Sequence, residues 1–357
     1  MKINKLITNF LILSILVFAV TSCESDDSIT MPKGVYDNGI LVSGEAGSIY
    51  YVSNDSLKVK SEKSSYVIKK DLGQYLQSMA FDTKNAYIMV DNQNTVTVVD
   101  RYTFEYIGTI TEGLKKPRYM TVVGNKGYVT NWGEGSYGAD VDDDYIAVVD
   151  LNTLIVISTI PVSIGVERII EKNGKLYVSH KGGNSTNNVI TVIDIATEAK
   201  TEITVNDTPD ELFFDNSGNL VVLCEGITLS YNDDWSAKEK TPVSITKINT
   251  TTNSVASKII FGANQYPTLL AYDGSDIYYN LGSKIYKMDD SATVLPTSEF
   301  VNTAFGIIYG LEVNNENLYV LNYEFTVQST MSIFNLGTKL EIASVKAPIG
   351  ASKIYFN

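Results

Sequence analysis

The sequence predicts an all-β fold, a seven-bladed β-propeller of four-stranded antiparallel blades. Three observations predict it. A strand-like run recurs seven times at spacings of 41 to 57 residues, and after each copy comes a run in which β-branched or aromatic residues alternate with polar ones. The mature chain contains no segment with helical periodicity. Alternation with a period of two is typical of strands, and four-stranded units of about 45 residues are typical of propeller blades.

Each unit supplies four strand-like runs. The recurring run reads NGILVSG (38–44), NAYIMVDN (85–92), KGYVTNW (126–132), GKLYVSH (174–180), GNLVVLC (218–224), SDIYYNL (275–281) and ENLYVLN (316–322). The first copy lacks a preceding strand, and the last residues of the chain, ASKIYFN (351–357), supply one. We expect this C-terminal strand to complete the first blade and close the ring, which removes exposed sheet edges.

The N-terminal residues 1–22 are predicted to be a signal peptide. Lys2 and Lys5 form a basic start, the apolar residues 6–20 are too few for a bilayer span, and VTSC (20–23) closes the segment. The segment resembles a bacterial lipoprotein signal. The resemblance implies cleavage before Cys23 and acylation of that cysteine as a lipid anchor. Residues 23–35 then form the acylated cysteine and an acidic linker, and residues 36–357 form the propeller.

The linker begins Glu24-Ser25-Asp26-Asp27, without an aspartate directly after the cysteine. This acidic run resembles the surface-export signal of one group of Gram-negative lipoproteins, and a plain acidic linker is the alternative interpretation. We expect a protein of the outer membrane, lipid-anchored and exposed at the cell surface.

The net charge and the number of cysteines argue against a nucleic-acid-binding protein and against a domain held together by disulfides. The formal charge is −13, and loss of the signal removes two lysines and no acids, which gives −13 − 2 = −15. A strongly acidic chain is a poor partner for nucleic acid. Cys224 is the one remaining thiol of the propeller, so it has no disulfide partner there, and we predict a core position on a strand.

The motifs of catalysis are missing. His180 is the only histidine, which excludes a His-rich metal site and makes any Ser-His-Asp relay depend on this one residue. No Gly-rich phosphate loop, CxxC or CxxCH occurs. We therefore expect no enzymatic activity and no cofactor.

The acidic stretch NWGEGSYGADVDDDY (131–145) raises the question of calcium. Asp140, Asp142 and Asp144 have the spacing that begins an EF-hand loop. Tyr145 stands where that loop needs glycine, and Leu151 where it needs a bidentate glutamate. We expect no metal here, and a looser site formed by residues 142–144 is the alternative to a solvated loop.

The connections predict two unlike faces. One face has tight turns such as GNKG and DLNT, rich in residues that favour turns. The other has long loops, at 131–144, 180–188, 224–242 and 322–329, together with the connections between blades, which approach the central channel. Long loops on a rigid scaffold commonly carry binding. The candidate ligand-binding residues are Tyr75, Gln77, Arg118, Tyr119, Trp132, Arg168, Asp210, Trp235, Tyr266 and Tyr309.

These residue types suit a flat, amphipathic ligand. We expect the tyrosines and tryptophans to stack on it, and Arg118 and Arg168 to donate hydrogen bonds to its amide or phosphate oxygens. In the alternative interpretation the arginines pair with Asp210, Glu211 or Glu167 as a structural ring.

Two resemblances bear on function. YVTN (128–131), followed by YIAVVDLNT, matches the repeat of YVTN-type, YncE-like propellers. The whole chain is also similar to surface cobalamin-binding propeller lipoproteins of TonB-dependent vitamin B12 uptake. LGQYLQSMAFD (72–82), LKKPRYMTVV (114–123), IYYNLGSKIYKM (277–288) and YGLEVNNENLYV (309–320) carry that similarity.

The second resemblance implies that the loop face captures a corrinoid and passes it to a TonB-dependent outer-membrane transporter, without catalysis. A glycan is the alternative ligand, because sugars favour the same aromatic groups. A docking platform for another envelope protein is the alternative function, and a propeller lyase or hydrolase is a third.

Overall fold

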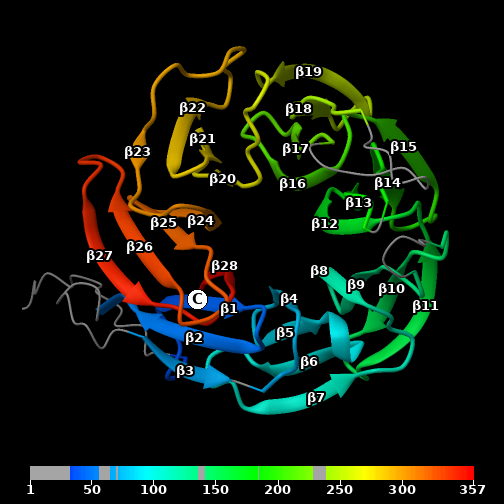
Figure 1. Cartoon of the computed structure of the whole chain (residues 1–357). Helices are drawn as coiled ribbons and strands as arrows, with labels where there is room; N and C mark the ends of the chain where they lie inside the picture. The colour runs from blue at the N-terminus through cyan, green and yellow to red at the C-terminus, as the bar shows by residue number, and fades with distance from the viewer. Residues whose placement is uncertain (1–32, 56–64, 70, 136–140, 184, 228–238) are drawn as a thin grey trace, which may run out of the picture. The chain divides into compact units, whose positions relative to one another are not determined.

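The computed structural model describes residues 33–55, 65–69, 71–135, 141–183, 185–227 and 239–357 (Figure 1). The predicted signal peptide, Cys23 and most of the linker lie outside these residues, and so do Asp140 and Trp235. Residues Gly34–Asn357 form one compact unit. No helix among the described residues has the length and apolar character that crossing a bilayer requires.

The described strands form seven four-stranded antiparallel sheets, which are the predicted seven blades of a β-propeller. Blade 1 contains β28 (Ala351–Phe356), β1 (Gly39–Gly44), β2 (Ser48–Ser53) and β3 (Ser65–Lys69). Blade 2 contains β4 (Leu76–Phe81), β5 (Asn85–Val90), β6 (Thr95–Asp100) and β7 (Tyr106–Ile110). Blade 3 contains β8 (Pro117–Val123), β9 (Lys126–Asn131), β10 (Tyr145–Asp150) and β11 (Ile155–Pro161).

The remaining blades follow in chain order. Blade 4 contains β12 (Val166–Lys172), β13 (Lys175–His180), β14 (Val189–Asp194) and β15 (Lys200–Thr204). Blade 5 contains β16 (Pro209–Phe214), β17 (Leu220–Cys224), β18 (Ser244–Asn249) and β19 (Ser254–Ile260). Blade 6 contains β20 (Leu270–Tyr272), β21 (Asp276–Leu281), β22 (Lys284–Asp289) and β23 (Val301–Asn302). Blade 7 contains β24 (Ile308–Asn314), β25 (Asn317–Asn322), β26 (Thr330–Asn335) and β27 (Glu341–Lys346).

The ring closes as the sequence predicts. The C-terminal β28 pairs antiparallel with β1, with Ile40 opposite Phe356 and Val42 opposite Ile354. β28 is thus the inner strand of blade 1, although it comes last in the chain. Because the two ends of the chain pair in one sheet, blade 1 is not complete until the last residues fold.

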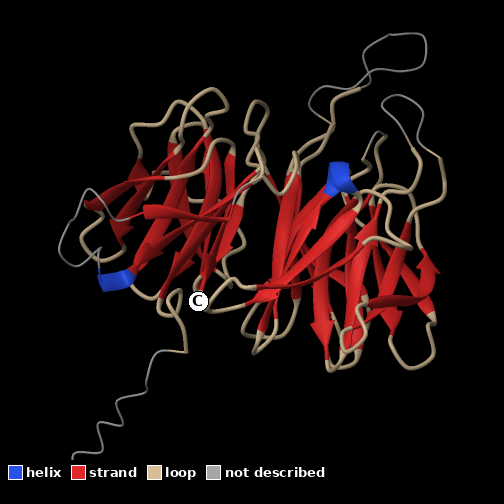
Figure 2. Cartoon of the chain, turned by 90° about the horizontal axis from the view of Figure 1, so that it is seen from below, coloured by secondary structure: helices blue, strands red, loops and turns tan. Residues whose placement is uncertain are grey.

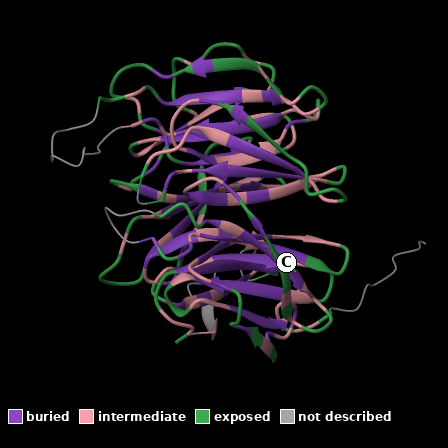
Figure 3. Cartoon of the chain, turned by 90° about the vertical axis from the view of Figure 1, so that its right-hand side faces the viewer, coloured by how far each residue is buried: buried purple, intermediate pink, exposed green. Residues whose placement is uncertain are grey.

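The core lies between the blades, where the faces of neighbouring sheets pack together. Tyr87 and Met89 of blade 2 pack in one cluster with Val129 and Ala147 of blade 3. Alternation along the strands explains this, because each blade is covered on both faces and its inner residues alternate between two clusters. Figure 3 shows the buried residues running through the strands, with exposed residues concentrated in loops and outer strands.

The strands run between two faces of the ring, and the loops gather at those faces (Figure 2). On one face, the loops that follow β9, β13, β17 and β25 and the connections into the inner strands lie together, as predicted from their lengths. The inner strands β28, β4, β8, β12, β16, β20 and β24 begin at this face, so their first residues surround the mouth of the central channel.

Candidate functional site

Six of the seven described inner strands carry a β-bulge near their first residues. Pairing with the next strand passes from Leu76 to Ser78 in β4, and from Ile308 to Gly310 in β24. The same shift occurs at the start of β8, β12, β16 and β28. A bulge leaves an extra residue out of the ladder and re-aims its side chain. The residues at the six bulges are Gln77, Arg118, Tyr119, Glu167, Arg168, Asp210, Glu211, Tyr309 and Ser352.

All of these bulge residues line one cavity of about 910 Å³ at the channel mouth. Its wall contains eight of the ten predicted residues, namely Tyr75, Gln77, Arg118, Tyr119, Trp132, Arg168, Asp210 and Tyr309. Tyr266 is exposed but does not belong to the wall, and Trp235 lies outside the described residues. The placement brings the eight together, and their contact with a ligand stays a prediction.

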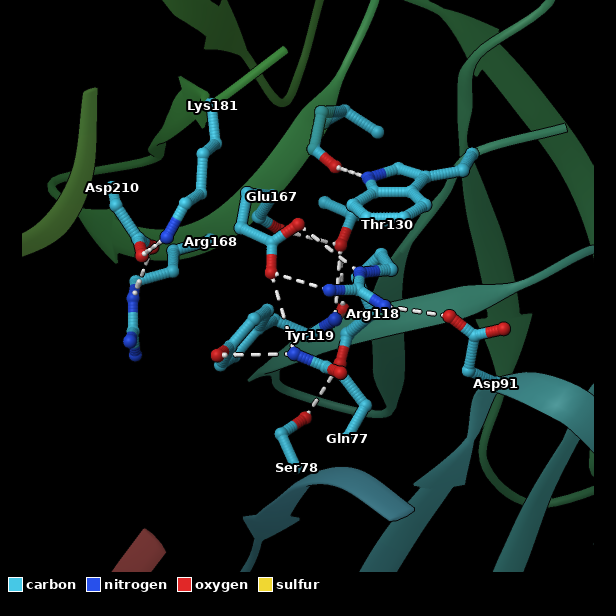
Figure 4. A network of polar contacts seen from close by, with 12 residues as sticks. Gln77, Ser78, Asp91, Arg118, Tyr119, Thr130, Glu167, Arg168, Lys181 and Asp210 are labelled. Carbon is cyan, nitrogen blue, oxygen red and sulfur yellow. Dashed lines mark hydrogen bonds and ion pairs between the residues drawn. The ribbon is translucent and has the colours of Figure 1, made fainter. Parts of the chain in front are cut away.

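Hydroxyl side chains of the neighbouring strands support two of the bulges. The backbone N–H of Tyr119 donates to Thr130 Oγ1 at 3.0 Å, and that of Arg168 donates to Ser179 Oγ at 3.1 Å. Thr130 Oγ1 in turn donates to the Glu167 carbonyl at 2.7 Å, which links blade 3 to blade 4 (Figure 4). In the YVTN tetrapeptide, the threonine therefore supports the bulges, while Tyr128 is buried in the core.

Arg118 joins three blades in a buried ion-pair network. Its Nε and Nη2 donate to the two carboxylate oxygens of Glu167 at 3.1 and 2.9 Å, and its Nη1 donates to Asp91 at 2.6 Å. The guanidinium carbon also lies 3.7 Å from the ring centre of Trp132, whose indole N–H donates to the Val166 carbonyl at 2.6 Å. An arginine side chain can pair with a carboxylate through two N–H groups and stack on an aromatic ring at the same time, which a lysine side chain cannot do (Figure 4).

A second network surrounds Asp210 on blade 5. One carboxylate oxygen of Asp210 accepts from Arg168 Nε at 2.8 Å, and the other from Lys181 Nζ at 2.7 Å. Arg168 also pairs with Glu211, and Lys181 donates to Glu225 at 2.9 Å. Three carboxylates thus share two cations.

This arrangement separates the pKa values of the carboxylates. Burial works against ionisation of Asp210, but Lys181 and Arg168 outweigh it and hold the pKa of Asp210 well below its usual range. Burial raises the pKa of Glu225 to about 7, because Lys181 offsets it only in part. Burial also raises the pKa of Glu211 despite its pairing with Arg168.

Both predicted arginines are therefore engaged by carboxylates of the protein. Glu167, Asp210 and Glu211 are the partners named in the alternative interpretation, and the pairing ring that it describes is the arrangement observed. Arg118 and Arg168 are ordered by these contacts before any ligand arrives. Their donation to ligand oxygens stays a prediction.

An aromatic wall stands on the blade 7 side of the cavity. We use that name for Tyr309, Tyr323 and Phe325, whose ring centres lie 4.9 to 5.5 Å apart in edge and tilted contacts. Tyr309 donates its hydroxyl to Glu45 at 2.7 Å, which fixes the innermost ring. Tyr323 lines the cavity and is 50% exposed, so it offers apolar surface at the rim, whereas Phe325, 40% exposed, packs against Tyr323 and is not part of the cavity lining.

His180 does not face the cavity. It is fully buried, with Nδ1 2.8 Å from the Ser163 carbonyl and Nε2 2.8 Å from the Thr191 hydroxyl. Burial lowers the pKa of His180 to about 4. Both ring nitrogens are occupied, so the residue serves the fold of blade 4.

The acidic loop has a structural task in its described part. Asp144 Oδ2 accepts the backbone N–H groups of Gly165 and Val166 at 2.6 and 2.9 Å, which anchors the chain as it enters β12. Asp143 Oδ2 accepts the backbone N–H of Glu134 at 2.9 Å. Among the described residues no group of three or more His, Cys, Asp or Glu side chains is placed to hold a metal ion.

Several residues that line the cavity were not predicted from the sequence. Lys181, Glu225 and Tyr323 are the first or second residues of loops that were recognised as long, but none was chosen. Lys353 lies directly after the connection at residues 350–352. The loop lengths carried a signal for the first three, and the bulge that places Lys353 leaves no mark in the sequence.

Comparison with known proteins supports the fold. No family model matches the chain, and no curated protein matches it. Among solved structures, a dihydro-haem d1 dehydrogenase, NirN, superposes with a TM-score of 0.59 at 12% identity, over 91% of this chain and 76% of that one. Hydrazine synthase of Kuenenia stuttgartiensis gives a TM-score of 0.56 at 16% identity, over 76% of this chain and 86% of that one.

The extracellular domain of a one-component system from B. thetaiotaomicron gives a TM-score of 0.60 at 14% identity, over 84% of this chain and 39% of that one. These similarities, at 12 to 16% identity, show the propeller fold alone. Function therefore has to be argued from the site.

Proposed function

We propose that the protein binds an amphipathic small molecule in the cavity at the channel mouth. The observation that carries this proposal is a cavity of about 910 Å³ that combines an aromatic wall with a floor of charged groups held in ion pairs. Aromatic surface and a few fixed polar groups are the usual lining of a small-molecule site. Groups that are ordered in advance also reduce the entropy lost on binding.

The ligand we propose is cobalamin or a related corrinoid. A corrinoid is large, partly apolar and rich in amides, so aromatic surface and hydrogen-bonding side chains such as Gln77 complement it. The resemblance of the sequence to cobalamin-binding propeller lipoproteins supports the same ligand. By that resemblance the protein would hold the corrinoid at the cell surface and pass it to a TonB-dependent transporter in the outer membrane.

We favour ligand binding over the two alternative functions, a docking platform and an enzyme. A docking platform favours a broad apolar surface without a pocket, whereas this face is hollowed. An acid–base enzyme is favoured by one observation, the separated pKa values of Glu225 and Asp210. Both carboxylates, however, pair with the same ammonium group of Lys181, and a purely structural ion-pair network shifts pKa values in the same way.

The test is a titration of residues 30–357 with cyanocobalamin, followed by calorimetry and by co-elution of the coloured ligand on a sizing column. We expect binding at a ratio of one to one. Tyr323→Ala should weaken it about tenfold or more, because an exposed aromatic contact is lost. Tyr106→Ala is the matched control, since Tyr106 is 62% exposed but lies on the outer strand β7.

Equal loss of affinity in both variants would contradict a site at the cavity. Absence of binding at millimolar cyanocobalamin would discard the corrinoid. A glycan array would then test the other ligand class.

The lipid anchor and the surface location have their own test. Replacing Cys23 with serine should abolish labelling of the cells' protein by radioactive palmitate and release the protein from the membrane fraction. External protease should digest the anchored protein on intact cells. Full protection from protease would instead favour the inner leaflet of the membrane.

A further inference from the structure

Five cationic side chains line the cavity, and four of them have acceptors within the protein. Arg118 and Arg168 each pair with two carboxylates, Lys181 pairs with Asp210 and Glu225, and Lys116 donates to a backbone carbonyl. Lys353 differs from these four. No described residue accepts a hydrogen bond from its ammonium group or lies within ion-pair distance of it.

The position of Lys353 follows from the closure of the ring. It lies on β28, directly after the bulge residue Ser352, and its side chain is partly buried in the cavity wall. Tyr119, Arg168 and Glu211 act on it through space from the inner strands of blades 3, 4 and 5. Lys353 is therefore a cation of the cavity lining that interacts through space with groups on blades 3, 4 and 5.

The nearby carboxylates attract Lys353 without contacting it. Arg168 pairs with both Asp210 and Glu211, and Lys181 takes the second oxygen of Asp210. Burial alone lowers the pKa of Lys353, but Tyr119 and these carboxylates outweigh it and raise the pKa above its ordinary value. The ammonium group stays charged at neutral pH, with its three donors unused by the described residues.

We propose that Lys353 forms an anion subsite of the cavity, where its ammonium group binds a phosphate or carboxylate group of the ligand. The planar part of the ligand then lies against the aromatic wall on blade 7. This inference rests on the proposed function and deepens it, because it requires a ligand with one flat, partly apolar region and one anionic group. A complete corrinoid meets this requirement, since the phosphodiester of its nucleotide loop carries a negative charge.

A purely structural role of Lys353 leads to a different expectation. In that case Lys353 only offsets the charge of Asp210 and Glu211 through space, and its removal disturbs the floor for every ligand alike. The two roles are separated by comparing ligands that differ in the anionic group.

The experiment compares cyanocobalamin with dicyanocobinamide, the corrinoid without the nucleotide loop and its phosphodiester, by calorimetry on residues 30–357. The proteins are the unchanged chain, Lys353→Gln, Lys353→Arg and the control Lys172→Gln. Lys172 is the last residue of β12, at the end of the strand opposite the cavity. Thermal unfolding of each variant checks that it is folded, and Lys353→Arg keeps the charge if the glutamine variant does not fold.

We expect Lys353→Gln to weaken cyanocobalamin about tenfold to a hundredfold, the usual range for a charged hydrogen bond, and to leave dicyanocobinamide within about twofold. Lys353→Arg should retain most of the preference for cyanocobalamin, and Lys172→Gln should change neither ligand. An equal effect of Lys353→Gln on both corrinoids, or no effect on either, overturns the anion subsite and leaves the proposed function standing.

A separate result applies if neither corrinoid binds the unchanged chain, which would reject the corrinoid itself. Phenyl phosphate, benzoate and phenol then serve as probes by thermal shift, because they share the aromatic ring and differ in the anionic group. Stabilisation by phenyl phosphate or benzoate that is lost in Lys353→Gln, with none by phenol, supports the subsite and shows which anion it takes. Equal behaviour of the three probes overturns it.

Discussion

Replacing Arg118 with methionine tests whether the ion pairs at the cavity hold neighbouring blades together. Methionine keeps much of the side-chain volume but removes all three charged hydrogen bonds to Glu167 and Asp91. The side chain of Glu167 is 4% exposed, and its remaining side-chain partner among the described residues is Gln77, at 3.3 Å. The substitution therefore leaves a carboxylate buried without its cation.

The expected loss of stability is large. Removing one partner of a buried ion pair costs about 3–5 kcal/mol. This range applies to Arg118 because its side chain is only 11% exposed. For a unit of this size such a loss lowers Tm by roughly 4–7 °C. The double variant Arg118→Met/Glu167→Gln removes the stranded charge as well, so it should recover about 2 kcal/mol or more of the loss.

Urea unfolding followed by tryptophan fluorescence and by circular dichroism at two wavelengths measures both variants. Coincident transitions are required before free energies are compared. A loss below about 1 kcal/mol for Arg118→Met would place the pair among weak surface ion pairs and refute the argument. A double variant that is less stable than the single one would show that Glu167 is not the group left uncompensated.

Three further predictions follow from described residues outside the ion pairs. His180 should titrate in NMR spectra near pH 4 rather than 6.5. Between these pH values the folded state binds fewer protons than the unfolded state, so the free energy of unfolding should fall by about 3 kcal/mol as the pH drops from 6.5 to 4. A normal titration near 6.5 would contradict the burial of His180. Gly165→Ala should lower the urea midpoint much more than Gly174→Ala. Both glycines have positive φ, of 72° and 75°, which costs alanine about 1 kcal/mol, but of the two only Gly165 would place a Cβ against backbone, 2.1 Å from Gly182 Cα. Equal losses in the two variants would refute the close approach of the backbones at Gly165. Deleting residues 351–357 should remove β28, expose the inner edge of β1 and yield aggregates on a sizing column, whereas a monomer with an unchanged Tm would show that ring closure adds no stability.

The fold was predictable because the sequence pattern of one blade recurs in seven units. Each blade repeats strand alternation and turn residues over a short stretch, so an error in one copy is corrected by the others. Even the unusual pairing of β28 with β1 followed from counting, since the first unit lacked one strand and the chain ended with a spare one. Strand length was less predictable, and β20 and β23 in blade 6 are shorter than their counterparts elsewhere.

The site was predictable in outline and not in its chemistry. Topology places the connections between blades at the channel mouth, and most of the chosen residues line the cavity for that reason. The sequence left open whether Arg118 and Arg168 face a ligand or the carboxylates. The choice depends on distances of about 3 Å between residues 40 to 50 positions apart, which no local pattern encodes.

The bulges explain why no contiguous motif marks this site. Six inner strands use the same backbone device, yet the first extra residue at each bulge is different, namely Gln77, Arg118, Glu167, Asp210, Tyr309 and Ser352. Since the backbone geometry is shared, local packing alone does not require six residue types at equivalent places. Part of the variation is explained by pairing across blades, as between Arg118 and Glu167. Such pairing does not explain the rest of the variation. Lys353, which follows the last bulge and has no such partner among the described residues, is therefore a position at which we expect ligand binding to select the residue type.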